Sequence, residues 1–195
     1  DAAGSTPKGR DLRTESAEVV AASGADGIAI GGSLGEDKAQ MYEVVDWTTG
    51  VLPEDRPRHL LGIGDVDDLI RGVELGIDTF DCAMPTRLGR HGVAVVPEPG
   101  RRWRVDLTGA RWKDSDEPIM EGCPCPACAN GHSRGYVRYL LKSRELQGVR
   151  LLTVHNLAYL ARLMADLRGA VVAGNLPERA AALRAGAAPA VPAAG

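Results

Sequence analysis

Apolar and polar positions follow two alternating patterns along the first ninety residues. Short apolar runs that end in glycine or a loop are typical of buried parallel strands, and between them apolar residues recur at helical spacing. The predicted strands are 26–32, 58–64 and 77–86, and the predicted helices are 11–22, 38–52 and 66–76. Alternating strands and amphipathic helices indicate βα units with a parallel sheet, so the predicted fold class is α/β.

The pattern changes in the second half of the chain. Segments 92–96 and 102–107 flank the turn sequence PEPG and are expected to pair as a hairpin, and helical periodicity returns at 133–148 and 155–174. The run LLTV before residue 155 is strand-like, and the Ala/Pro-rich end offers little to bury. We therefore expect three parts: βα units over 1–100, a second unit over 101–174 and a flexible tail over 175–195.

Composition and charge narrow the functional class only a little. The 195 residues are 25% charged and 44% hydrophobic, as in ordinary globular domains, and they contain no run of 18 apolar residues and no apolar signal segment at the start. A cytoplasmic protein without a membrane anchor is therefore expected. The net charge of −3 hides an uneven distribution, with 9 basic and 18 acidic residues in 1–100 against 10 and 6 in 101–150. The second segment could bind a polyanion, or it could be an ordinary solvated surface.

Three cysteines form the most specific motif. Cys123, Cys125 and Cys128 have the spacing C-x-C-x2-C, which can supply three corners of a tetrahedral zinc site. The fourth ligand could be His132, which is near in sequence, or His155, which lies 27 residues beyond Cys128. Four protein ligands leave no open position for a substrate or water, so such a zinc would be structural; scattered free thiols are the alternative.

Candidate catalytic groups lie where the predicted strands end. The carboxyl ends of parallel strands share one edge of a sheet, so the sequences after the three strands are expected to surround a common pocket. Asp81 follows the third strand beside Phe80, where a buried carboxylate is costly unless it has a function or a partner. A helix cap or a bridge to Arg87 would be the non-catalytic explanation. In the same predicted loop, Arg87 and Arg90 could contact phosphates, or lie on an ordinary surface.

Several of these segments, in this order, resemble one enzyme family. GIAIGGSLGE, HLLGIG, IDTFDCAMPTRLGRHG, CPCPACA and TVHNLAYLARLM are together similar to bacterial tRNA-guanine transglycosylases, also called queuine tRNA-ribosyltransferases, over roughly residues 11–172. The resemblance implies the C-terminal half of a TIM (β/α)8 barrel, incomplete in this chain, with a zinc-binding subdomain. It also implies a pentosyltransferase that exchanges guanine at the tRNA wobble position for a 7-deazaguanine base, through a covalent bond between an aspartate and the ribose. We expect little or no exchange by the isolated chain.

The resemblance also assigns roles to individual residues. Asp81 corresponds to the nucleophile, and the zinc ligands correspond to Cys123, Cys125, Cys128 and His155, which favours His155 over His132. The base-binding positions are Gly31, Gly32, Glu36 and Leu61, and the tRNA-binding positions are Arg87 and Arg90. The implied partners are tRNA, the base substrate and a second copy of the chain, with the zinc region near the dimer interface.

Two departures and two alternatives accompany this assignment. The pocket loop after Gly32 is one residue shorter than in the family, which leaves the choice of base open. Asp65 stands where the family often has Lys, so one possible phosphate contact is missing.

Two alternative functions stay open. One is a non-catalytic tRNA-binding accessory subunit, against which the retained Asp81 argues. The other is a relative that modifies DNA.

Overall fold

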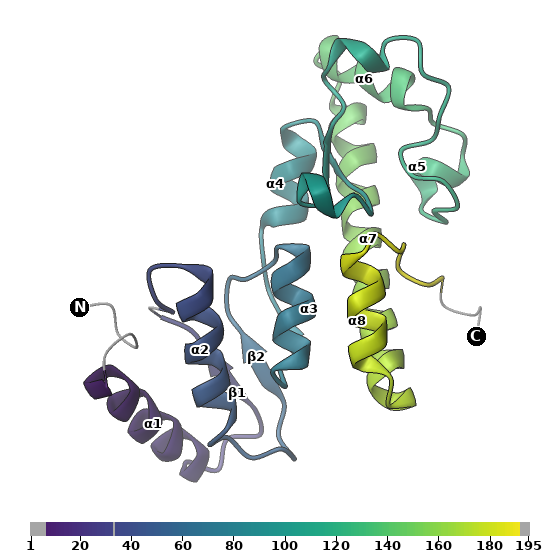
Figure 1. Ribbon diagram of the computed structural model, residues 1–195. Coiled ribbons are helices and arrows are strands. Elements are labelled where there is room, and N and C mark those ends of the chain that lie inside the picture. Colours follow the sequence, from purple (N-terminus) through teal and green to yellow (C-terminus); the bar gives the residue numbers. More distant parts are fainter. Residues whose placement is uncertain (1–6, 33, 192–195) are drawn as a thin grey trace. The chain divides into compact units, whose positions relative to one another are not determined.

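The computed structural model describes residues 7–32 and 34–191, and packing divides the chain into two compact units, Asp1–Cys82 and Ala83–Gly195 (Figure 1). Each unit is considered by itself below. No helix in the described ranges is both long and apolar enough to cross a membrane.

The first unit is a small α/β layer. Strands β1 (Ile28–Ile30), β2 (Arg58–Leu60) and β3 (Thr79–Phe80) form a parallel sheet in the order β1-β2-β3. Ala29 pairs with His59, and His59 pairs with Thr79. The helices are α1 (Pro7–Ala22), α2 (Lys38–Thr49) and α3 (Val66–Glu74). The α/β prediction is confirmed, and these three strands form an open sheet rather than a closed barrel.

Apolar side chains of the strands and of the first two helices form the core of this unit. The buried cluster comprises Ala17, Ile28, Ile30, Val45, Leu52, Leu60 and Ile77. The Asp37 carboxylate caps α2 by accepting a hydrogen bond from the Gln40 amide at 2.9 Å, which satisfies a donor at the start of the helix. Local capping and burial of one apolar face together explain why these segments match their predicted ranges within a few residues.

The second unit is built around one long helix. Its elements are α4 (Met84–Arg90), β4 (Val93–Val95), β5 (Arg104–Asp106), α5 (Pro126–Ala129), α6 (Arg134–Lys142), α7 (Leu146–Ala173) and α8 (Leu176–Arg184), with short 3-10 turns at Pro99–Arg101 and Ala110–Trp112. Strands β4 and β5 pair antiparallel, which confirms the predicted hairpin. Figure 1 shows α8 beside the second half of α7.

Three local predictions for this unit are wrong. The run LLTV belongs to α7, where Leu151 and Leu152 are buried on one face; a short apolar run does not distinguish a strand from a buried helix. The segment from residue 84 to 90 is helix α4 rather than a loop, with Pro85 at its first turn, where proline is favourable. The predicted tail contains α8, which buries Ala180 and Leu183.

Helices α4 and α7 approach each other closely at Gly89. A Cβ atom added there would lie 2.6 Å from the Thr153 hydroxyl oxygen and 3.0 Å from the Thr153 backbone nitrogen. We expect Gly89→Ala to lower the free energy of unfolding by about 1–3 kcal/mol, because the backbone of α7 cannot move aside without repacking. Chemical denaturation measures the change. Gly169→Ala on α7, where a Cβ meets nothing within 4 Å, is the control and should be neutral or stabilising. Equal stability of Gly89→Ala and wild type would contradict the close packing.

Candidate active site and metal centre

Asp81 lies directly after β3, and its carboxylate is held by groups from the neighbouring strand β2. The Gly62 amide donates to Asp81 Oδ1 at 3.0 Å, and His59 Nε2 lies 3.1 Å from the same oxygen. The ends of the second and third strands therefore do converge, as predicted. The expectation that Asp81 is buried is wrong, because 61% of its side chain is exposed at the edge of the sheet. Its partners, rather than its burial, set its electrostatics.

The two hydrogen bonds favour the ionised form of Asp81. Donation from the Gly62 amide is the larger cause, followed by the contact with His59, and together they hold the pKa of Asp81 below its ordinary value. Neither of these hydrogen bonds goes to Oδ2. The carboxylate is thus charged at neutral pH, with one oxygen anchored by these two groups.

Three of the four predicted base-binding residues line one cavity. Gly31, Gly32 and Leu61 contribute to a cavity of about 330 Å³ between α1 and the outer edge of β1. A Cβ at Gly31 would lie 2.6 Å from the Leu61 Cδ1 atom, so Leu61 would have to move aside, and Gly32 has a φ of +79° that favours glycine. Arg13 Nη1 donates to the Gly31 carbonyl at 3.0 Å, so α1 fixes the start of this loop.

Glu36 is not among the residues that line this cavity. Its side chain is exposed, and its backbone N–H donates to Gln40 Oε1 at 2.8 Å. Its proposed contact with the base therefore has no geometric support beyond its place in the loop.

A cluster of charged groups near the end of β2 was not predicted. Lys38 Nζ on α2 lies 2.7 Å from Asp68 Oδ1 and 3.4 Å from Asp65 Oδ2, and the Tyr42 hydroxyl donates to Asp68 at 2.6 Å. Burial lowers the pKa of Lys38, but the hydrogen bond to Asp68 and the two negative charges outweigh it and raise the pKa. Asp65 is thus part of an ion-pair network, which explains how a carboxylate is accommodated where a basic residue was expected.

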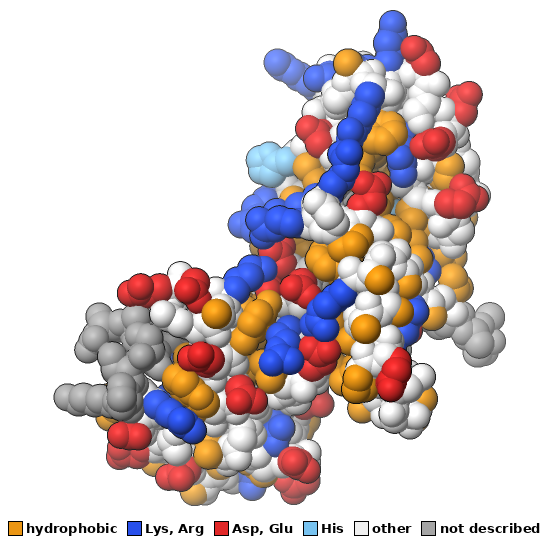
Figure 2. Space-filling view, viewed as in Figure 1, with side chains coloured by type: hydrophobic (Ala, Val, Ile, Leu, Met, Phe, Trp, Pro, Cys, Tyr) orange, Lys and Arg blue, Asp and Glu red, His pale blue; other side chains and the backbone are white. Residues whose placement is uncertain are grey.

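Arg87 and Arg90 belong to the second unit. Both are exposed, and their spacing of three residues on α4 places them on one side of the helix. In Figure 2, basic side chains also project from the region of α6, with acidic groups between them. The surface of this unit therefore offers cations to a polyanion.

The predicted metal ligands come together as a compact group. The Cys123, Cys125 and Cys128 thiols lie 3.8, 3.5 and 3.5 Å from His155 Nδ1, and the four ligand atoms lie within 4.8 Å of one another. Hydrogen bonds among the three thiols lower the pKa of Cys123 and raise the pKa of Cys128, so in the absence of a cation the group shares its protons rather than holding three thiolates. His155 rather than His132 completes the set, and His132 instead stacks on Tyr136.

Contacts outside the ligand set orient His155. Its Nε2 lies 2.9 Å from the Val95 carbonyl, so Nε2 carries a proton, and in the neutral ring that a metal requires Nδ1 presents its lone pair to the centre of the ligand group. The buried Asn156 accepts from the Val95 amide at 2.8 Å and donates to the Pro85 and Val93 carbonyls. Three thiolates and one imidazole, largely buried and already converged, fit tetrahedral Zn²⁺ with all four positions filled by protein. The sequence did not predict this hydrogen-bonding role of Asn156. Its position next to His155 in the sequence was the only indication of it.

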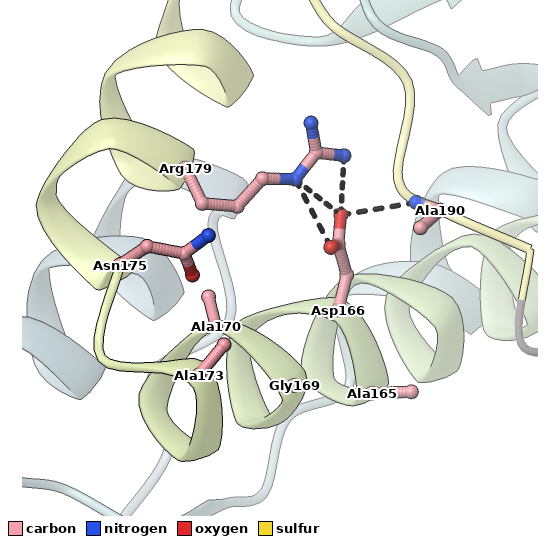
Figure 3. Close-up of a pocket in the computed structure, with 8 residues that line it drawn as sticks. All are labelled: Ala165, Asp166, Gly169, Ala170, Ala173, Asn175, Arg179 and Ala190. Carbon is pink, nitrogen blue, oxygen red and sulfur yellow. Dashed lines mark hydrogen bonds and ion pairs between the residues drawn. The ribbon is translucent and has the colours of Figure 1, made fainter.

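A second cavity, of about 310 Å³, lies between α7 and α8 and contains none of the predicted site residues (Figure 3). Its walls are mostly alanine and glycine, and Arg179 pairs across it with Asp166, whose carboxylate also accepts from the Ala190 amide. These polar groups satisfy one another, so the cavity is explained by the packing of α8 and the following residues.

Comparisons with known proteins identify the family to which the chain is similar. The family model described as "Queuine tRNA-ribosyltransferase" matches residues 4–187. Curated proteins named queuine tRNA-ribosyltransferase are 49% identical in Roseiflexus sp. over 165 residues and 45% identical in Symbiobacterium thermophilum over 169 residues. These matches cover 85% and 86% of the chain but 41% of each relative, so the chain spans less than half the length of these relatives. The chain belongs to the queuine tRNA-ribosyltransferase family.

Proposed function

We propose that this chain forms part of a tRNA-guanine transglycosylase and supplies its nucleophile, part of its base pocket and a structural zinc site. The observation that carries the proposal is the anchoring of Asp81 at the shared edge of the sheet, with Oδ1 bound by Gly62 and His59 and most of the side chain exposed. The open parallel sheet would form a segment of a (β/α)8 barrel, whose active sites lie at the carboxyl ends of the strands.

The reaction would proceed in two displacements. Oδ2 of Asp81 would attack C1′ of the wobble nucleotide; the C1′–N9 bond would break, and guanine would leave with the bonding electron pair and take up a proton. N9 of a 7-deazaguanine base would then attack C1′ and lose its proton to solvent, and the Asp81 carboxylate would leave with the electron pair of the Oδ2–C1′ bond. The lowered pKa of Asp81 supports the second step in particular, because a stabilised carboxylate leaves more readily.

The cavity bounded by Gly31, Gly32 and Leu61 is the proposed base site. Leu61 is 47% exposed at the end of β2 and offers an apolar surface to the flat face of a purine. The Leu61 amide donates to the Ile30 carbonyl at 2.9 Å, which would hold the backbone beneath that surface. A zinc ion bound by the three cysteines and His155 would have a structural role only. It would attach the loop that contains Cys123 to helix α7.

Incorporation of radiolabelled guanine into tRNA is the direct test of this function. The full-length gene product should exchange labelled guanine into a tRNA that has guanine at the wobble position, since the first displacement is reversible. A DNA oligonucleotide with the same base sequence should give little exchange if the protein recognises the ribose 2′-hydroxyl. Binding of tRNA without any exchange would favour the accessory-subunit alternative, and exchange into DNA alone would favour a DNA-modifying relative.

Arg87 and Arg90 are the proposed tRNA contacts on α4. Each substitution by alanine should weaken tRNA binding by roughly 2–10-fold and reduce the slope of log affinity against log salt by about 1, because one phosphate contact is lost. Filter binding at several salt concentrations measures both quantities. Arg168→Ala, which removes an exposed arginine from α7, is the matched control. An unchanged salt slope in both α4 variants would exclude them from the interface.

A homodimer with the zinc region near its interface is the proposed assembly. Tyr136 and Tyr139 on α6 are 43% and 62% exposed, and this apolar surface lies in the same unit as the zinc group. Sedimentation of the full-length protein measures the assembly state.

A further inference from the structure

Three helix ends of the second unit meet at close contacts. A Cβ atom added at Gly92, just after α4, would lie 3.3 Å from Leu141 Cδ1 on α6. One added at Gly148, in the first turn of α7, would lie 3.1 Å from the Leu141 backbone nitrogen, and Gly89 on α4 packs against Thr153 on α7. The end of α4, the end of α6 and the start of α7 therefore lie side by side (Figure 1).

Exposed basic side chains project from all three of these helix ends. On α7, Arg150 lies three residues before Thr153, so it is on the side of the helix that faces α4. We call the five exposed cations of these helix ends the basic junction: Arg87, Arg90, Lys142, Arg144 and Arg150.

Negative charge is scarce in the same segments. Helices α4 and α6 contain no Asp or Glu, Asp166 is the acidic residue of α7, and the exposed Glu145 stands just before α7. Among the residues that the structure describes, no cation of the basic junction forms an ion pair with a carboxylate, whereas Arg101, Arg134 and Arg179 do. The junction thus carries an excess of positive charge that the described residues leave unpaired.

The requirements of the fold do not explain this set of cations. Arg144 has a φ of +58°, in the left-handed region where glycine is less strained than any L residue, and its side chain is exposed. The dipole of α6 favours cations at its C-terminal end, such as Lys142 and Arg144. Arg150, however, lies near the N-terminus of α7 and gains nothing from that dipole.

We propose that the basic junction binds the sugar–phosphate backbone of RNA, and that it extends the contact surface proposed for Arg87 and Arg90 to Arg144 and Arg150. The inference rests on the proposed function for the identity of the RNA, which is tRNA. A guanidinium group can donate two parallel hydrogen bonds to one phosphate. Such contacts do not depend on base sequence, so the junction adds affinity and the base pocket adds specificity.

Two substitutions separate RNA binding from structural support. Arg144→Gly removes a cation and also relieves the strained backbone, and Arg150→Gln removes a cation from a helix without changing its polarity. Arg168→Gln is the control, because this exposed arginine is on the same helix but about 27 Å farther along its axis. Filter binding of tRNA and of an RNA hairpin without a wobble guanine would be measured with the full-length protein at several salt concentrations.

Each substitution in the junction should weaken binding of both RNAs by roughly 2–10-fold and reduce the slope of log affinity against log salt by about 1. The double variant should reduce the slope by about 2, and Arg168→Gln should change neither quantity. Arg144→Gly should have a thermal midpoint equal to or above that of wild type, because glycine adopts this φ without strain.

An unchanged salt slope in the double variant would overturn the inference. A lower thermal midpoint of Arg144→Gly would also overturn it, since Arg144 would then serve the fold. Loss of self-association in sedimentation, with RNA affinity unchanged, would assign the junction to contacts between copies of the protein instead. Wild type that binds both RNAs through the junction but exchanges no base would overturn the proposed function and leave this inference standing.

Discussion

Substitution of Asp81 by asparagine should abolish formation of the covalent adduct between the full-length protein and tRNA. Asparagine has nearly the same shape and can keep the hydrogen bond from the Gly62 amide, but its neutral amide is a poor nucleophile. We expect base exchange to fall by at least about 10³-fold, as is usual when a nucleophile is removed. Gel electrophoresis under denaturing conditions detects the adduct, and incorporation of labelled guanine measures exchange.

The matched control for this experiment removes an equivalent charge elsewhere in the same unit. Asp55 is exposed between α2 and β2, so Asp55→Asn should retain full exchange. Binding of tRNA by Asp81→Asn should change little, because the carboxylate repels phosphates rather than attracts them. Adduct in equal yield from wild type and Asp81→Asn would show that another group is the nucleophile.

Removal of zinc should unfold the part of the second unit that surrounds the cysteine loop. The three thiolates and His155 are largely buried and would repel or remain unsatisfied without a cation, and binding free energies of structural zinc are on the order of 10 kcal/mol. We expect one zinc per chain, and loss of the circular dichroism signal of helices near the site after chelation. Elemental analysis and circular dichroism measure the two quantities.

Cysteine variants assign the metal to these residues. The double variant Cys125→Ser, Cys128→Ser should lose zinc, whereas Cys82→Ser, which removes the cysteine outside the ligand set, should keep it. His155→Ala should lose zinc, and His132→Ala should not. A full complement of metal in the double cysteine variant would contradict the assignment.

Local sequence signals were sufficient for most of the elements of the first unit. The positions of β1, β2 and α2 follow from apolar runs, glycine stops and the Asp37 cap, all of which act within a few residues. The elements of the second unit were harder to predict from sequence. The run LLTV is too short to show a helical or strand periodicity, and it lies in a helix that buries Leu151 and Leu152. The helix α8 was missed for a similar reason, since it is Ala-rich and lies against α7, a contact that local sequence does not reveal.

The sequence by itself determined the fold class, the family and the group of cysteines, and it pointed to Asp81 as the candidate nucleophile, because these depend on residue type and on spacing along the chain. Only the tertiary structure decided that Asp81 is exposed and held by Gly62 and His59, that Asp65 pairs with Lys38, and that Asn156 ties α7 to β4. Each of these contacts joins residues 19 to 61 positions apart. The physical reason is that a hydrogen bond or an ion pair depends on distance in space, which local periodicity does not encode.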